Sequence, residues 1–315
     1  MAEDSLLPTK LDESAEHWPA DIGSRIELVN PGSAPVDGDA LAERLCRLKE
    51  VTHVQVGLQS TLRDVRFVRS LPSLKTLVVA GRNIQSLDGL ETFRGSVSID
   101  TSLNRRRTLS HLAGLSLTHL AVSYGRPEDL ADIGQVVRVE SLRLSKFPHV
   151  TTAALRSCNP TYLGLHGGGT TELRDTAEIE SLRQVGLFAC RKLETFEGDN
   201  SALTWLVVDA CQRLALETLV SAPHIRALTV VGTREPIRAG VLRGLRHLEE
   251  LSLRKCFLDA ALSDVALWWP SLRKGWFGGL KRPELEALSR HVPTASISNG
   301  ICAFRGGDPI ALGED

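Results

Sequence analysis

The stretch Leu74-Lys-Thr-Leu77-Val-Val79 sets a pattern that returns along most of this 315-residue chain. It continues through Arg82 to Ile84, so the whole segment fits L-x-x-L-x-L-x-x-N-x-I with Arg82 at the Asn position. Residues 77 and 79 alternate with a period of two, which is typical of a short β-strand with one buried face. One such strand cannot bury that face alone.

The apolar pair recurs at intervals of 20 to 24 residues. We take the first residue of each pair as its marker; the residue two positions later is apolar in every copy. The markers are Val54, Leu77, Val97, Leu120, Leu142, Leu163, Val185, Leu206, Leu228, Leu251, Gly275 and Ala295. Self-similarity at so narrow a period predicts a solenoid, in which stacked repeats bury a continuous core.

The pattern resembles the leucine-rich repeat family over roughly residues 48–300. Cys190, Cys211 and Cys256 stand at the Asn position, as in cysteine-containing leucine-rich repeats. The resemblance implies an α/β fold, a leucine-rich repeat solenoid curved like a horseshoe. Its parallel β-sheet would line the concave face, with short helices and turns on the convex face.

Both ends of a solenoid need caps, because the terminal repeats would otherwise expose core. We expect a flexible N-terminal tail over residues 1–20 and an N-terminal cap over 21–50, with a strand at 25–28 and a helix at 37–48. The repeat domain spans 51–300 with about 12 repeats, and a short helix at 283–291 precedes a last strand at 295–298. Residues 301–315 are expected to form a C-terminal tail.

The composition excludes several classes of protein. Hydrophobic residues make up 42%, which excludes wholesale disorder, and no run of 18 apolar residues predicts a transmembrane helix. A net charge of −1 argues against a nucleic-acid or anionic-membrane partner. The six cysteines are spread without a C-x-x-C pair, so we expect no metal and no cofactor. The acidic, polar N-terminus carries no signal peptide, and a soluble cytoplasmic bacterial protein is the expected setting.

Three local features have alternative interpretations. The Gly-rich run 166–171 is predicted to be a structural turn, because no Lys follows it as in a phosphate-binding loop. Arg105–Arg107 could bind an anion, but such a run is more often a solvated loop. Cys190 and Cys211 fall on adjacent repeats and could pair or bind metal; the favoured interpretation is a ladder of buried thiols.

The concave face is the predicted binding surface, because the strand residues flanking each inward pair point out of the sheet there. Aromatic and charged side chains gather at its centre, with Gly164 and Gly186 between them leaving a hollow. Aromatic and Arg side chains in such a position are typical of binding hot spots. The predicted binding residues are Arg143, Tyr162, His166, Phe188, Trp205 and Asp209.

These observations favour a non-enzymatic, monomeric scaffold that binds a protein partner on its concave face. A bacterial effector-neutralising or immunity-type binder suits this shape by analogy. The alternative is an enzyme or small-ligand-binding protein that uses the hollow around His166, Asp209 and Arg143, although no G-x-S-x-G or H-E-x-x-H motif is present. Two further alternatives remain: the aromatic rings merely cover the sheet, or a one-residue register error turns them inward.

Overall fold

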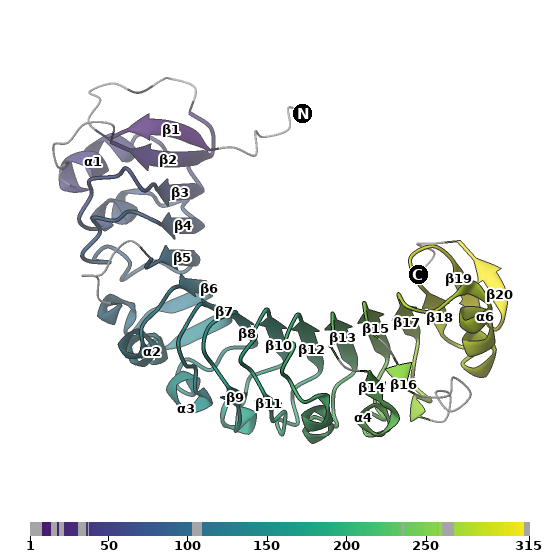
Figure 1. The fold of residues 1–315 in the computed structure, drawn as a ribbon. Coiled ribbons are helices and arrows are strands. Elements are labelled where there is room, and N and C mark those ends of the chain that lie inside the picture. Colours follow the sequence, from purple (N-terminus) through teal and green to yellow (C-terminus); the bar gives the residue numbers. More distant parts are fainter. Residues whose placement is uncertain are drawn as a thin grey trace. The chain divides into compact units, whose positions relative to one another are not determined.

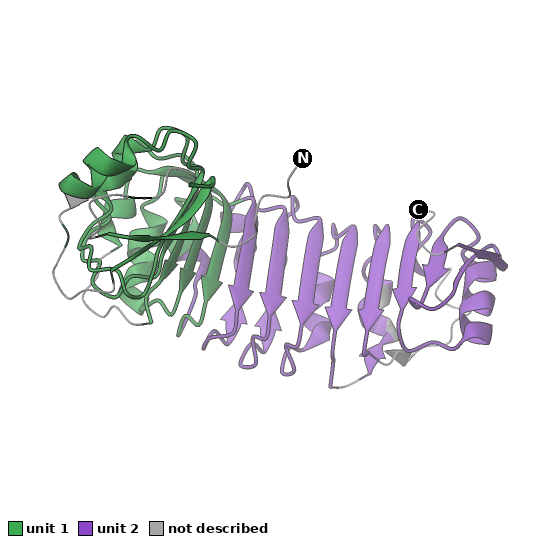
Figure 2. Ribbon diagram, turned by 90° about the horizontal axis from the view of Figure 1, so that it is seen from above, with its two compact units in different colours: residues 1–148, 154–160 green, residues 149–153, 161–315 purple. Residues whose placement is uncertain are grey.

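We describe the fold from a computed structural model of residues 1–315. The structure describes residues 8–13, 18, 22–30, 36, 38–102, 109–234, 236–256, 258–259 and 268–311. Figure 1 shows the elements in chain order, and Figure 2 colours two compact units. Unit 1 comprises residues 1–148 and 154–160, and unit 2 comprises residues 149–153 and 161–315.

Unit 1 contains a parallel sheet in which each strand pairs with the next one in the chain. Its strands are β1 (Thr9–Asp12), β2 (Arg25–Val29), β3 (His53–Val56), β4 (Thr76–Val79), β5 (Ser96–Asp100), β6 (Ser116–Ser123) and β7 (Arg138–Ser145). The helical segments that connect them are α1 (Gly38–Leu45), η1 (Arg66–Ser70), η2 (Ser110–Leu112) and α2 (Pro127–Gly134). The short helix α3 (Thr152–Leu155) follows β7.

Unit 2 repeats the same plan, and Figure 2 shows its strands side by side. The parallel strands are β8 (Tyr162–His166), β10 (Gln184–Phe188), β12 (Trp205–Asp209), β13 (Ala227–Val231), β15 (Glu250–Arg254), β17 (Lys274–Phe277) and β18 (Ser296–Ser298). The return segments carry β9 (Glu172–Leu173), η3 (Thr176–Glu178), β11 (Thr195–Phe196), η4 (Leu216–Ser221), β14 (Ile237–Arg238), α4 (Ala239–Arg243) and β16 (Leu258–Asp259).

The register confirms the repeat pattern in both units. Marker pairs with marker across neighbouring strands, as Val54 with Leu77 in unit 1 and Val185 with Leu206 in unit 2. The marker residues and their partners two positions later form a core of Leu, Val and Ile side chains that are almost fully buried. Each unit therefore has the leucine-rich repeat fold, with one parallel strand per repeat and a mostly irregular or 3₁₀ return segment.

One predicted marker is wrong. Gly275 pairs with Ile297 and not with Ala295, so the last repeat is 22 residues long, the difference between 297 and 275. Ala295 and Ile297 are both fully buried. Because residues two apart face the same side of a strand, the apolar pattern alone does not exclude a slip of two.

Seven consecutive repeats leave their strands through a residue with a left-handed backbone, four positions after the marker. The φ angles there lie between 50° and 67°, and Gly fills the position only at 167 and 232. The other five repeats use Tyr124, Lys146, Ala189, Ala210 and Lys255. A residue with a side chain is strained at positive φ. In these five repeats the exit turn therefore imposes a left-handed backbone on residues that ordinarily avoid it.

We expect Ala210→Gly to stabilise the protein by about 1 kcal/mol, because glycine removes the Cβ strain at φ 54°. The midpoint of urea unfolding measures this change. Ala121→Gly is the matched control, since Ala121 lies in ordinary extended backbone inside β6. That control should destabilise by about 0.5–1 kcal/mol. A destabilised Ala210→Gly variant would contradict the strained exit turn.

The residue after the exit turn reaches back to the preceding repeat. The Cys190, Cys211 and Cys256 thiols donate to the carbonyls of Leu165, Leu187 and Val230, at 3.5, 3.4 and 3.3 Å. Each acceptor is the second apolar residue of the neighbouring strand, and all three cysteines are buried. The predicted ladder of buried thiols is thus also a ladder of weak hydrogen bonds that satisfies backbone carbonyls.

Arg82 does not fill the corresponding position after β4, contrary to the sequence pattern. Its side chain is exposed, and the next residue, Asn83, donates to the Ser60 carbonyl at 2.9 Å. The Asn83 amide is a stronger donor than a thiol. Asn83 lies one residue after the position that the cysteines occupy in their repeats. The residues 105–107, predicted to form a solvated loop, lie outside the described residues.

The segments expected as tails contain strands. Near the N-terminus β1 pairs in parallel with β2. Glu13, directly after β1, is fully buried and accepts the Thr61 N–H at 3.2 Å, and burial raises the pKa of its carboxyl. The N-terminal cap therefore includes residues before 21, and its expected strand and helix appear as β2 and α1.

The C-terminal end is closed by a hairpin and a helix. The strand β18 continues into antiparallel β19 (Ala303–Arg305) and β20 (Asp308–Ile310). The helix α6 (Arg282–His291) buries Leu285 and Leu288, as the pattern predicts. Residues 303–310 thus form part of the C-terminal cap, because an antiparallel hairpin covers the last parallel strand.

Candidate functional site

The candidate site lies on the unit 2 sheet, on the face opposite the buried marker side chains. We call this face the front face. Three rows of side chains cross it because the strands are paired in register. The first row begins Tyr162, Gln184, Trp205; the second begins Gly164, Gly186, Val207; the third begins His166, Phe188, Asp209. Five of the six predicted binding residues thus share neighbouring strands.

Two aromatic side chains lie over the glycines of the second row. A Cβ atom added to Gly186 would come within 2.5 Å of the Phe188 ring and 2.8 Å of the Tyr162 hydroxyl. At Gly164 the Tyr162 hydroxyl would lie at 2.9 Å. The expected open hollow is therefore wrong, because the rings of Tyr162 and Phe188 fill the space that the glycines leave.

The filled hollow produces an aromatic surface. The rings of Tyr162 and Trp205 are 6.3 Å apart and tilted by 44°, and those of His166 and Phe188 are 6.3 Å apart and nearly parallel. Tyr162, Phe188 and Trp205 are half-buried, so each ring keeps an exposed part. We call Tyr162, His166, Phe188, Trp205 and Asp209 the aromatic patch.

The positions of His166, Asp209 and Arg143 do not form a catalytic arrangement of the kind that the alternative interpretation needs. Phe188 stands between His166 and Asp209 in the third row. In the described part of the chain no hydrogen bond or ion pair joins His166 to Asp209. A general base needs an orienting partner within hydrogen-bond reach, and this pair does not provide one. Arg143 is an exposed residue of β7 in unit 1, whereas the other five residues belong to unit 2.

A groove adjoins the aromatic patch on the same face of unit 2. It has a volume of about 210 Å³ and lies between Trp205 of β12 and Trp276 of β17. Small side chains form its floor, among them Ala227, Thr229 and Ser252. The groove gives the front face the depth that the two glycines do not.

Trp276 and Arg254 extend the site beyond the predicted residues. The Arg254 guanidinium lies 4.8 Å from the centre of the Trp276 ring and donates to the Ser252 hydroxyl at 3.2 Å. Both residues occupy outward positions of their strands. The sequence did contain the signal, because Trp276 directly follows marker Gly275; the missing apolar side chain at that marker weakened it.

The buried cysteines differ in acidity: the hydrogen bond with the Cys211 thiol lowers the pKa of Cys190, although Cys190 itself is buried. Burial raises the pKa of the Cys158 thiol to about 11, and the neighbouring Cys190 thiol together with burial raises the pKa of Cys211. No cluster of three His, Cys, Asp or Glu residues suited to a metal ion occurs in the described ranges.

Thiol labelling of the native protein should therefore separate the exposed cysteine from the four buried ones. Cys46 is exposed and should react at once, whereas Cys158, Cys190, Cys211 and Cys256 should stay unmodified until denaturant is added. Mass spectrometry of the labelled peptides measures this order, and Cys46→Ser should remove the fast phase. Rapid labelling of Cys190 or Cys211 in native protein would contradict their place in the core.

Comparisons with known proteins found similar solved structures. No family model matches the chain, and no curated protein matches it. One similar solved structure is the functional domain of InlJ from Listeria monocytogenes, which includes a cysteine ladder; identity is 14%, the TM-score is 0.43, and 80% of this chain and 53% of that one are covered.

Two other structures have the same low identity. The TLR13–ssRNA13 complex has 14% identity and a TM-score of 0.46, and covers 92% of this chain and 48% of that one. The leucine-rich repeat protein LIC12759 of Leptospira interrogans has 14% identity and a TM-score of 0.39, with 86% and 83% covered. This chain thus spans about half the length of the first two.

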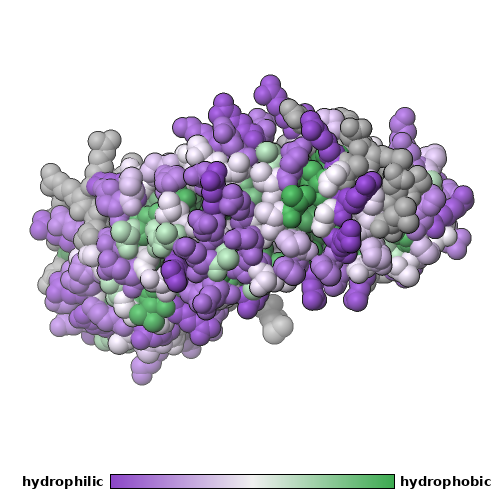
Figure 3. All heavy atoms as spheres, turned by 90° about the horizontal axis from the view of Figure 1, so that it is seen from below, coloured by the Kyte–Doolittle hydropathy of each residue, from purple (hydrophilic) through white to green (hydrophobic). Residues whose placement is uncertain are grey.

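The repeat register and the parallel sheets define the class of fold: each unit has the leucine-rich repeat fold. No helix in the described residues has both the length and the apolar character needed to span a bilayer. Figure 3 shows the side of the chain that carries the return segments, where hydrophilic residues predominate.

Proposed function

We propose that this protein is a non-enzymatic scaffold that binds a protein partner through the front face of unit 2. The observation that supports it most is the aromatic patch: three half-buried rings on adjacent strands, two of them held over glycines. Preorganised aromatic side chains contribute contact area at a low cost in conformational entropy, which is why they dominate interface hot spots. Arg143 remains a candidate contact from unit 1.

The charges around the patch favour a partner of mixed polarity. Asp209 borders the aromatic rings, and Glu250, Arg254 and Lys274 line the groove beside them. Interfaces commonly combine an apolar centre with a polar rim that sets orientation. A partner helix or loop with an apolar side chain for the groove, surrounded by both acidic and basic residues, fits this surface.

The experiment is an affinity capture with three baits. Wild-type protein should retain one stoichiometric protein from cells that express this chain, and Trp205→Ala should lose it. A third bait, Arg213→Ala, changes an exposed side chain of the return segment that forms only a surface ion pair with Glu194 at 3.5 Å, and it should retain the partner. Equal retention by the wild-type protein and Trp205→Ala would refute the proposed face.

The alternative function, an enzyme or small-ligand site around His166, Asp209 and Arg143, has a different expected result. A small molecule would raise the melting temperature of the isolated protein, since a ligand that binds only the native state stabilises it. Such a shift, abolished by His166→Ala and Asp209→Ala, would favour the alternative. The cytoplasmic setting, the bacterial origin and the monomeric state stay proposals from the sequence.

A further inference from the structure

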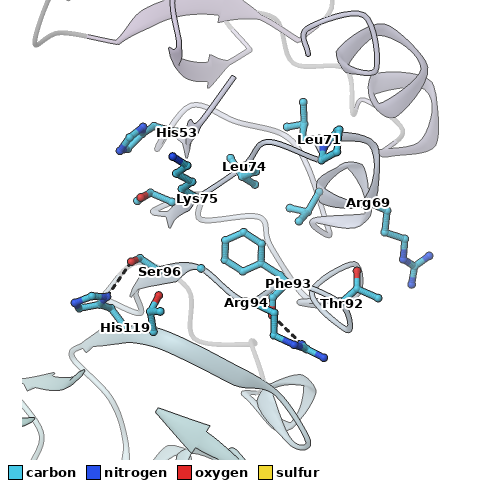
Figure 4. A pocket seen from close by; sticks show the side chains of 15 residues that line it. His53, Arg69, Leu71, Leu74, Lys75, Thr92, Phe93, Arg94, Ser96 and His119 are labelled. Atoms are coloured by element: carbon cyan, nitrogen blue, oxygen red, sulfur yellow. Dashed lines mark hydrogen bonds between the residues drawn. The ribbon is translucent and has the colours of Figure 1, made fainter. Parts of the chain in front are cut away.

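Unit 1 contains a cavity of about 690 Å³ at the edge of its sheet where the strands begin. Figure 4 shows three groups of side chains around it. His53, Lys75, Ser96 and His119 lie along one side, and Leu71, Leu74 and Phe93 form the centre. Arg69, Thr92 and Arg94 lie along the other side.

The cavity is positively charged and has no acidic wall. Five of its 15 lining residues are Lys, Arg or His, and none is Asp or Glu. Glu91 neutralises Arg69 through an ion pair of 2.8 Å. Lys75 and Arg94 form no ion pair with any residue that the structure describes. Two permanent positive charges therefore remain uncompensated on opposite sides of the cavity.

The positive charges of Arg25 and Lys75 also act on His53, which lines the same cavity. Burial lowers the pKa of this histidine, and the charges of Arg25 and Lys75 lower it further. Arg25 belongs to the preceding strand, where it pairs in register with His53, and Thr76 follows Lys75 on the other side. A ligand with negative charge would relieve this repulsion.

The centre of the cavity is apolar. Leu71, Leu74 and Phe93 line it while exposing only 4, 8 and 7% of their surfaces, so they form a firm floor. Gly95 permits this packing, because a Cβ atom there would come within 2.6 Å of the Phe93 ring. A suitable ligand must therefore place an apolar group between two anionic ones.

We propose that this cavity binds an acidic peptide segment in which an apolar side chain lies between carboxylates. An extended peptide spaces its residues by about 3.4 Å, so it can hold carboxylates on both sides of a central apolar residue, facing Lys75 on one side and Arg94 on the other (Figure 4). The hydroxyls of Thr76 and Thr92 also line the cavity, and the Ser96 hydroxyl bonds to the His119 ring at 3.2 Å. This site is independent of the function proposed for unit 2.

The probe is a fluorescein-labelled peptide with a central phenylalanine flanked on each side by two glutamates. Fluorescence anisotropy with the full-length protein should show saturable binding that weakens as salt is added, because exposed charge pairs are screened. Replacing the four glutamates with glutamine should abolish it. The double variant Lys75→Glu, Arg94→Glu should weaken binding by about tenfold, since each exposed pair contributes up to about fivefold.

Arg82→Glu is the matched control. Arg82 is exposed and lies beyond the opposite end of β4, so its reversal should leave the affinity nearly unchanged. Melting temperatures establish whether each variant is folded. If the double variant does not fold, Lys75→Met replaces it in the binding measurement. In NMR titrations the acidic peptide should raise the pKa of His53.

Four outcomes would overturn the proposal. The first is equal binding of the glutamate and glutamine peptides. The second is unchanged affinity of the folded Lys75 and Arg94 variants, and the third is an equal loss in Arg82→Glu, which would indicate unspecific attraction. The fourth is inorganic phosphate that displaces the peptide at equal concentration and shifts His53 alone, which would make this a site for small anions.

Discussion

Leu187→Ala should lower the free energy of unfolding by about 2–5 kcal/mol, the range for removing a fully buried leucine. Leu187 has no exposed surface, and in its row it pairs with Leu165 on one neighbouring strand and Val208 on the other. A central repeat is held on both sides, so it cannot collapse around the cavity that the substitution leaves. Leu165→Ala should behave in the same way.

Equilibrium unfolding in urea measures this loss. Gln184→Ala is the control on the same strand, because Gln184 is exposed on the front face, and it should change stability by less than about 0.5 kcal/mol. A loss below about 1 kcal/mol in Leu187→Ala would contradict a continuous leucine core.

Trp205→Ala should weaken partner binding by at least about 2 kcal/mol, a roughly 30-fold loss of affinity. Trp205 is half-buried on the front face and lies beside both the Tyr162 ring and the groove that ends at Trp276. Its removal deletes apolar contact area and one wall of the groove. Tyr162→Ala should have a similar effect, because this ring lies over both glycines.

Stability should change little in Trp205→Ala, by about 1 kcal/mol from the lost aromatic contact. Calorimetric titration gives the affinity, and thermal unfolding gives the stability. Arg213→Ala should alter neither quantity. An unfolded Trp205→Ala variant would show that Trp205 belongs to the core, and unchanged affinity would show that the partner docks elsewhere.

Gly186→Ala tests whether the positions of the rings matter. Its new Cβ would meet side-chain atoms of Phe188 and Tyr162 and no backbone atom among its three nearest contacts, so the rings can shift and the fold should tolerate it. Partner affinity should fall although every aromatic residue is still present. Unchanged affinity would mean that binding does not depend on the positions of the Tyr162 and Phe188 rings.

The period of the apolar pairs was enough to predict the strands and their faces. Each marker from 54 to 275 falls in a described strand, and each of those up to Leu251 pairs with the next marker in its unit. The sequence could not decide between Ala295 and Ile297, because residues two apart lie on the same face of a strand. It also placed a tail where Thr9–Asp12 add a strand, since a four-residue strand carries too short a pattern.

The sequence predicted which residues of the candidate site point out of the sheet. It did not predict how their side chains pack against one another. Register places Tyr162, Phe188 and Trp205 on adjacent strands, but the direction in which a ring turns depends on its neighbours. For that reason the glycines predicted a hollow where the structure has two rings. The cavity of unit 1 was missed because Leu71, Leu74 and Phe93 lie before their strands, outside the outward positions.

The central claim is that a partner covers the front face of unit 2, and cysteine footprinting tests it most directly. In a Cys46→Ser background, one variant carries Gln184→Cys, between Tyr162 and Trp205 in the first row, and another carries Glu178→Cys, on the return segment of the same unit. Both positions are exposed. We predict that bound partner protects Cys at 184 from labelling and leaves 178 as reactive as in the free protein. Protection at 178 with full reactivity at 184 would contradict the account.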